Sequence, residues 1–157
     1  MTAPRQPSVA AGAGAARVKH LPVARGPAFP AGHMLVPSPA LVAAAVARVP
    51  RGRVLPLGAL RAQLAAAAGA DYTCPVTTGL VLRAVARQAW ATVAEASHDD
   101  PPLPVWRVVR DDGALLDGLP GGTAAPAQRL AAEGVAVTPG PRGEHVRPLD
   151  DVTWDGA

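Results

Sequence analysis

One proline-rich apolar stretch constrains this chain more than any other: Leu103-Pro104-Val105-Trp106-Arg107-Val108-Val109-Arg110. Prolines at positions 101, 102 and 104 exclude a helix here, because proline removes a backbone donor and disfavours helical backbone in the residue before it. Valine and tryptophan favour extended backbone, and Gly113 can take the positive φ of a turn. The stretch therefore predicts a short apolar strand, with the rest of the chain packed around it.

Helical patterns surround this strand. Ser38 followed by Pro39 is typical of a helix start, since serine caps free amides and proline fits the first turn. Apolar residues at three- and four-residue spacing predict buried helix faces. The expected helices cover residues 39–49, 57–67, 77–94 and 124–133, with Gly69, Thr77 or Thr78, Thr123 and Gly134 at their ends. Residues 70–76 are expected as a connecting turn, and residues 135–137 with 145–147 as a hairpin. The predicted fold class is mainly α with short strands.

Composition divides the 157 residues into one domain and two tails. Residues 1–36 are rich in Ala, Pro and Gly without a period, so we expect them to be a disordered basic tail. The domain is expected to cover residues 37–150, and residues 151–157 to form a second tail. Met34 stands just before the first expected helix and is an alternative start of the chain.

Several classes of protein are disfavoured by composition. The single cysteine, Cys74, excludes an internal disulfide and a cysteine-based zinc site. No run of about 18 apolar residues predicts a membrane span, and the start lacks the apolar core of a signal peptide. Paired acids at 99–100 and 111–112 are expected in solvent-exposed turns. We therefore expect a cytoplasmic protein without membrane, metal or cofactor.

Charge is unevenly distributed along the chain. Residues 1–36 carry a formal charge of +4, residues 37–94 carry +5 and residues 95–157 carry −6, which together give +3. Helix 77–94 contains Arg83 and Arg87 four residues apart on one face. A basic half favours a polyanionic partner; arginines scattered in solvent are the alternative.

Four short motifs resemble the alkylguanine-DNA alkyltransferases, the suicidal methyltransferases that repair alkylated guanine. Residues 104–109 resemble their active-site strand Pro-Cys-His-Arg-Val-Val. Asp112-Gly113-Ala114-Leu115 with Gly121-Gly122, and residues 129–134 ending in Glu133-Gly134, resemble segments that follow it. Val49-Pro50-Arg51-Gly52-Arg53-Val54 resembles their entry to a winged helix-turn-helix. The likeness covers residues 38–135 and implies a winged helix-turn-helix fold.

The resemblance implies a cysteine that takes the alkyl group, activated through a histidine and a glutamate, after the damaged nucleotide has been flipped out of the duplex. Here Val105 and Trp106 stand at the cysteine and histidine positions. Glu133 keeps the glutamate position, where helix-end capping or a salt bridge with Arg107 is the simpler role. Leu57 stands where the family has a tyrosine that turns the nucleotide. Gly79, or Leu80 in a shifted register, replaces the intercalating arginine, with Arg83 one turn later.

The non-catalytic alkyltransferase-like proteins are the nearest precedent for such losses. The chain is therefore expected to bind double-stranded DNA as a monomer, with repair proteins as further partners. The expected DNA-binding residues are Thr77, Thr78, Gly79, Arg83 and Arg87. The expected lesion pocket comprises Leu57, Val105, Trp106, Arg107 and Glu133. Two alternatives remain: a diverged transferase that uses Cys74, whose thiol a helix N-terminus would activate, and a protein-interaction module that kept the fold without DNA.

Overall fold

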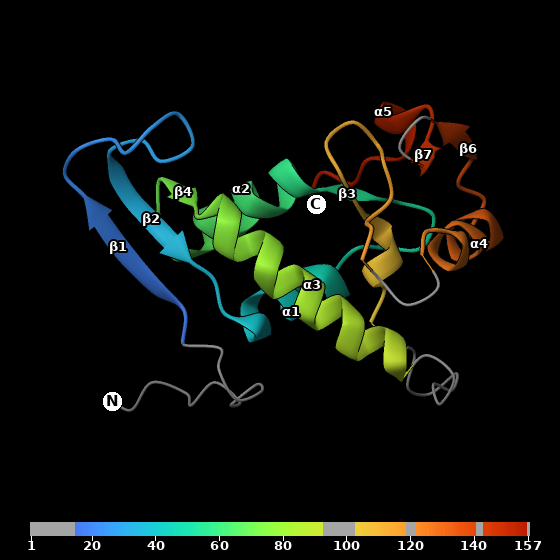
Figure 1. The fold of residues 1–157 in the computed structure, drawn as a ribbon, viewed down its shortest axis with the longest axis horizontal. Helices are drawn as coiled ribbons and strands as arrows, with labels where there is room; N and C mark the ends of the chain where they lie inside the picture. Colours follow the sequence, from blue (N-terminus) through green and yellow to red (C-terminus); the bar gives the residue numbers. More distant parts are fainter. Residues whose placement is uncertain (1–14, 93–102, 119–121, 141–142, 157) are drawn as a thin grey trace.

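The computed structural model describes residues 15–92, 103–118, 122–140 and 143–156, and these ranges form a mixed α/β fold in which helix predominates (Figure 1). The elements in chain order are β1 (Arg17–Leu21), β2 (Gly32–Val36), α1 (Pro39–Ala47), β3 (Leu55–Pro56), α2 (Leu57–Ala68), β4 (Tyr72–Thr73), α3 (Pro75–Ala91), the 3-10 helix η2 (Val105–Arg107), β5 (Val108–Val109), α4 (Ala124–Ala132), β6 (Val137–Gly140), β7 (Gly143–Val146) and α5 (Leu149–Val152). Across these ranges, no helix has both the length and the hydropathy needed to span a membrane.

Two of the predicted helix ends are confirmed and one is wrong. The Ser38 side chain caps α1 by accepting a hydrogen bond from the Leu41 amide at 3.2 Å. Gly69 ends α2 with a φ of +67°, the left-handed backbone that glycine adopts without a steric cost. Helix α3, however, begins at Pro75 rather than after Thr77 or Thr78, because proline fits the first helical position. Its predicted extension beyond residue 92 lies outside the described residues.

The central apolar stretch is only partly a strand. Val105–Arg107 form one 3-10 turn, closed by the Arg107 amide donating to the Pro104 carbonyl at 3.0 Å. Only Val108–Val109 are extended, and they pair in parallel with Leu55–Pro56. The predicted burial holds, since Val105, Val108 and Val109 are at most 1% exposed. The stretch lies in the main core, to which α1, α2, α3 and α4 contribute Val42, Val46, Leu60, Leu64, Leu82, Ala86 and Leu130.

The N-terminal region differs most from its prediction. Strands β1 and β2 form an antiparallel hairpin, and β2 pairs in parallel with β4, which gives a sheet of order β1-β2-β4. The expected disorder therefore does not apply to residues 15–36, and residues 70–76 contain a strand. A second small core of Leu21, Met34 and Cys74 holds the hairpin against the body. The sequence did not predict the hairpin, because its few large apolar residues lie among many alanines, prolines and glycines.

The C-terminal region contains a hairpin as predicted, with Val137 opposite Val146. Its strands are β6 and β7, at residues 137–140 and 143–146 rather than 135–137 and 145–147. Gly113 takes the predicted positive φ, +90°, and its backbone lies so near the Val146 carbonyl that a Cβ atom would be 2.7 Å from that oxygen. Thr123 precedes α4, although its side chain forms no capping hydrogen bond. Trp154 is 8% exposed and belongs to the main core, so the last residues pack against the domain.

Candidate nucleic-acid interface and the Glu133 cluster

A buried ion pair joins the end of α4 to the central stretch. Glu133, whose side chain is 3% exposed, follows the last residue of α4 and accepts a hydrogen bond from Arg107 Nη2 at 2.6 Å. The Nε atom of Arg107 donates to both carboxylate oxygens, at 2.9 and 3.0 Å. The same guanidinium donates through Nη1 to the Val49 carbonyl at 2.7 Å. The salt bridge expected between Arg107 and Glu133 is thus present, with the fork geometry that arginine provides.

Two further donors complete the surroundings of the Glu133 carboxylate. The indole Nε1 of Trp106 donates to it at 3.1 Å and the Gly52 amide at 3.2 Å. Burial alone would raise the pKa of Glu133, but hydrogen bonds from Arg107, Trp106 and Gly52 outweigh it and hold that pKa below its ordinary range. We call Glu133, Arg107, Trp106 and Gly52 the Glu133 cluster. It joins three segments that are far apart in the sequence.

The residues expected to line a lesion pocket are mostly packed inside the protein. Val105 is fully buried and Trp106 is 5% exposed. The Trp106 ring packs edge-on against Trp90 of α3, with centroids 6.3 Å apart, and the Arg129 guanidinium lies 4.9 Å from its centroid. Leu57 is half-buried at the start of α2. The tryptophan therefore occupies the space beside Glu133, and its ring nitrogen binds the carboxylate.

Helix α3 carries one continuous exposed stripe. Val76, Leu80, Arg83 and Arg87 recur at spacings of four, three and four residues, which places them on a single helix face. Val76 is 58% exposed and Leu80 is 63% exposed, an unusual degree for large apolar side chains. Arg83 forms an exposed ion pair with Asp117 at 3.5 Å. The stripe, which we call the α3 stripe, is apolar toward the start of the helix and basic further along it.

The other residues expected to bind DNA lie at the start of α3 and differ in exposure. Thr78 is 1% exposed, and its hydroxyl donates to the Cys74 carbonyl at 2.7 Å. Thr77 is half-buried, and its amide donates to Cys74 Sγ at 3.5 Å. A Cβ atom on Gly79 would meet open space. Thr78 therefore fixes the start of the helix, while Gly79 and the α3 stripe face outward.

Three arginines that contribute to the positive charge of residues 37–94 are tied to later segments. Arg48 donates to the Gly156 carbonyl at 3.3 Å and lies over the Trp154 ring. Arg51 donates to the Ala132 carbonyl at 2.9 Å, and Arg53 to the Asp151 carbonyl at 2.8 Å. Sequence alone grouped these arginines with Arg83 and Arg87 as one basic half. The structure separates these three arginines from Arg83 and Arg87, because each of the three donates to a backbone carbonyl of a later segment. A count of charges along the sequence does not contain this information.

Cys74 lies in an apolar environment. It is 6% exposed, and its core neighbours include Leu21, Met34 and the half-buried Phe29. Its sulfur accepts a hydrogen bond from the Thr77 amide. Among the described residues, no three His, Cys, Asp or Glu side chains are grouped as metal ligands. These contacts match a small buried side chain that caps a helix.

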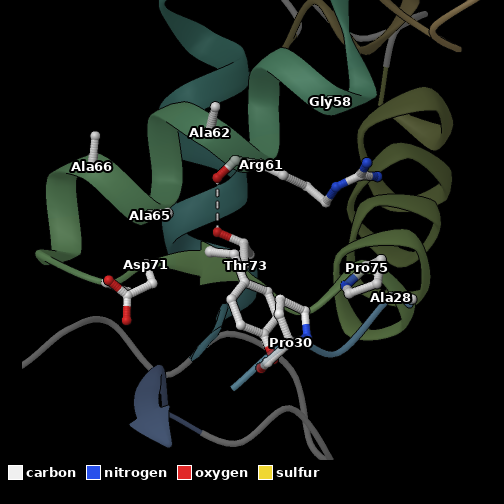
Figure 2. Close-up of a pocket in the computed structure, with 12 residues that line it drawn as sticks. Ala28, Pro30, Gly58, Arg61, Ala62, Ala65, Ala66, Asp71, Thr73 and Pro75 are labelled. Atoms are coloured by element: carbon white, nitrogen blue, oxygen red, sulfur yellow. Dashed lines mark hydrogen bonds between the residues drawn. The ribbon is translucent and has the colours of Figure 1, made fainter. Parts of the chain in front are cut away.

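A cavity of about 560 Å³ lies beside α2, between its outer face and β4 (Figure 2). Its wall is formed by small residues of α2, and the Arg61 guanidinium extends along it toward Pro75 at the start of α3 (Figure 2). Thr73 donates to the Arg61 carbonyl at 2.8 Å, and Asp71 accepts from the His33 amide at 2.7 Å. The predicted lesion-pocket residues do not line this cavity.

Comparison with known proteins gives structural neighbours only. No protein-family model matches the chain, and no curated protein matches it. The structure is similar to Schizosaccharomyces pombe Atl1, an alkyltransferase-like protein, in complex with damaged DNA containing O6-carboxymethylguanine, with a TM-score of 0.49 and 22% identity over 74% of this chain and 93% of that chain. It is also similar to S. pombe ATL in complex with DNA, with a TM-score of 0.45 and 23% identity over 72% of this chain and 90% of that chain.

Proposed function

We propose that this protein binds duplex DNA through the α3 stripe, with a preference for alkylated guanine, and transfers no alkyl group. The observation that carries the proposal is the α3 stripe itself. It places two large exposed apolar side chains and two exposed arginines on one face of the longest helix in the described ranges. Arginines bind backbone phosphates, and apolar side chains of groove-binding proteins contact or wedge between bases.

The surrounding elements support this role for α3. Helix α2 ends at Gly69, and only β4 and its flanking residues separate it from α3. Two helices joined so closely, with the second one exposing basic residues, fit a helix-turn-helix unit. We infer that the β6–β7 hairpin serves as the wing of the winged helix that the motif resemblance implies.

The arginines of the α3 stripe can exchange an acidic side chain of the protein for a DNA phosphate. The pair between Arg83 and Asp117 is exposed, with side chains 52% and 63% accessible, and exposed pairs contribute only about 0–1 kcal/mol. A DNA phosphate can therefore replace Asp117 at little cost. Arg87 has no ion pair or side-chain hydrogen bond within the described residues. The guanidinium groups of Arg83 and Arg87 can therefore both bind phosphates of the DNA backbone.

The chemistry of the central stretch argues against alkyl transfer. Valine at position 105 has no nucleophilic atom, and the Trp106 indole nitrogen can donate a hydrogen bond but cannot act as a base. The Cys74 thiol is buried among apolar groups rather than facing the α3 stripe's exposed side chains. Preference for alkylated guanine rests on the motif resemblance around Val105 and Trp106.

The test is a binding titration with matched duplexes, one of which contains a single O6-methylguanine, at several salt concentrations. Wild type should bind both duplexes with a steep salt dependence, because phosphate contacts release counterions. Replacing Arg83 and Arg87 by glutamine should reduce the slope of log K against log salt by about 1.8. The matched control is the double variant Arg48→Gln and Arg53→Gln, which removes the same charge from exposed residues outside α3 and both hairpins.

Each result separates the alternatives. A preference of tenfold or more for the alkylated duplex, about 1.4 kcal/mol, supports lesion recognition, whereas equal affinity leaves DNA binding without it. No binding at low salt contradicts the proposal and favours the interaction module. A mass increase of one methyl group on Cys74 after incubation with the methylated duplex would instead establish the diverged transferase.

A further inference from the structure

The β1–β2 hairpin carries a concentration of positive charge, and the one acid described against it, Asp71, contacts His33 rather than the arginines or the lysine. Residues 1–36 contain four basic residues and no Asp or Glu. Arg17, Lys19 and Arg25 lie in the described part of this segment, and all three are exposed. Within the described residues, none of the three has an ion pair or a side-chain hydrogen bond to the protein. Nothing in the described fold uses these charges.

Two of the three cations frame a small cavity of about 330 Å³ that is lined by Lys19, Leu21, Arg25, Phe29 and Met34. Lys19 stands opposite Met34 in the register of the hairpin. The floor is apolar, since Leu21 and Met34 are 4% and 7% exposed. The cavity therefore combines two ammonium or guanidinium groups with an apolar surface. A ligand that fits it has an anionic group attached to an apolar one.

The hairpin is fixed in position beside the start of α3. Leu35 of β2 pairs with Thr73 of β4, and the Cys74 amide donates to the Leu35 carbonyl at 2.8 Å. Cys74 is the N-cap of α3. The hairpin consequently lies next to the N-terminal end of α3 (Figure 1), which is the end that carries Val76 and Leu80.

We propose that the β1–β2 hairpin is a second DNA contact, in which Lys19 and Arg25 bind a backbone phosphate of the duplex that α3 engages. The proposal rests on the proposed function of α3 and deepens it. The sugar-phosphate backbone has the required chemistry, because its phosphate suits the two cations and its deoxyribose suits the Phe29 and Met34 floor. The fixed link through Leu35 and Cys74 gives the hairpin a constant position relative to α3, which simultaneous contact with one duplex requires.

The experiment compares wild type with the double variant Lys19→Gln and Arg25→Gln on unmodified duplex DNA over a range of salt. Because the two cations bind one phosphate, the slope of log K against log salt should fall in magnitude by about 0.9 in the double variant. Affinity at low salt should fall roughly tenfold or more. The charge-matched control, Arg48→Gln with Arg53→Gln, should change the slope by much less. Circular dichroism checks that each variant is folded, and the two single variants replace the double variant if it is not.

The outcomes distinguish this inference from the function of α3. A reduced slope for the hairpin variant, beyond that of the control, supports the second contact. If wild type binds DNA and the Arg83 and Arg87 variant weakens it, while the hairpin variant equals the control, the hairpin inference is wrong and α3 binding stands. Loss of binding to phosphatidylserine vesicles with unchanged DNA binding would also overturn it. If wild type binds no DNA at low salt, both proposals fail.

Discussion

The Glu133 cluster and the surface formed by α3 and the β1–β2 hairpin use positive charge in opposite ways. In the cluster, the Arg107 side chain is 14% exposed, and its three nitrogens donate to Glu133 and to the Val49 carbonyl. On the surface, Arg87 and Lys19 are exposed and have no such partner within the described residues. In the first region, the arginine joins segments of the fold. In the second, the cations are exposed to solvent, and we propose that they bind DNA.

This difference shows that the role of an arginine depends on its acceptors rather than on its position in a basic segment. Arg48, Arg51 and Arg53 fall in the most basic part of the sequence, yet each donates to a carbonyl of a C-terminal segment. These contacts link segments of the fold as those of Arg107 do, although the three side chains are exposed as that of Arg87 is. Substitutions in the two regions should accordingly affect stability and binding separately.

The largest effect on stability is expected for Glu133→Ala. Removing the carboxylate leaves the buried Arg107 guanidinium without its counter-ion, which costs about 3–5 kcal/mol of unfolding free energy in such pairs. Urea denaturation followed by circular dichroism measures this loss. Arg87→Gln is the control, and it should stay within about 0.5 kcal/mol of wild type because its side chain is exposed. A loss below 1 kcal/mol for Glu133→Ala would show that the cluster is not what holds these segments together.

A smaller loss is expected for Trp106→Phe, which keeps an aromatic ring but removes the donor to Glu133. Hydrogen bonds to charged groups contribute about 1.5–3 kcal/mol. The same denaturation assay measures the change, both in wild type and in the Glu133→Ala background. Since the two residues share one hydrogen bond, the effect of Trp106→Phe should shrink in that background. Equal effects in both backgrounds would mean that the indole contributes through packing alone.

Much of the fold could be predicted from local signals. Ser38-Pro39 located the start of α1, Gly69 located the end of α2, and Gly113 located a turn, because each depends on the backbone preference of one or two residues. The start of α3 was predicted too late in the chain because Thr77 and Thr78 are both residues that commonly cap helices. Pro75, which precedes them, was the stronger signal, and the cap is a cysteine whose sulfur accepts only weakly.

The strand in the central stretch and the hairpin before residue 37 depended on tertiary contacts that no local pattern contains. In the central stretch, only the two residues that pair with Leu55–Pro56 of β3 are extended, whereas Val105–Arg107 form a 3-10 turn although valine favours extended backbone. The hairpin is anchored by Leu21 and Met34 against Cys74, which is 40 residues from Met34 in the sequence. In the candidate site, the Arg107–Glu133 pair was anticipated from the motif positions. The indole donation from Trp106 was not, since it requires knowing that the ring lies beside the carboxylate.

The smallest effect is expected from acidification, and it sharpens the comparison because, of the two regions, the Glu133 cluster is the one built on a buried carboxylate. The pKa of Glu133 in the folded protein lies below its ordinary value, owing to hydrogen bonds from Arg107, Trp106 and Gly52 that outweigh burial. A carboxyl group with a lowered pKa stabilises the folded state above about pH 4.3, the ordinary value of a free glutamate, and loses that contribution as pH falls through the lowered pKa. The unfolding free energy of wild type should therefore decrease as pH is lowered from 6 toward 3.

Glu133→Gln isolates this contribution, since glutamine cannot titrate. The pKa of Asp117 is also lowered: burial, the largest single contribution, would raise it, but the combined effects of Arg110, Arg83 and a backbone hydrogen bond outweigh burial. That carboxylate is present in both proteins, so its response cancels in their difference. The stability gap between wild type and Glu133→Gln should be constant above pH 5 and should narrow on acidification, as the wild-type carboxyl takes up its proton. A stability gap that does not change with pH would show that the Glu133 cluster stabilises the fold through shape and hydrogen bonding and not through the charge of Glu133. The cluster would then resemble the arginine–carbonyl contacts of Arg51 and Arg53 more than an ion pair.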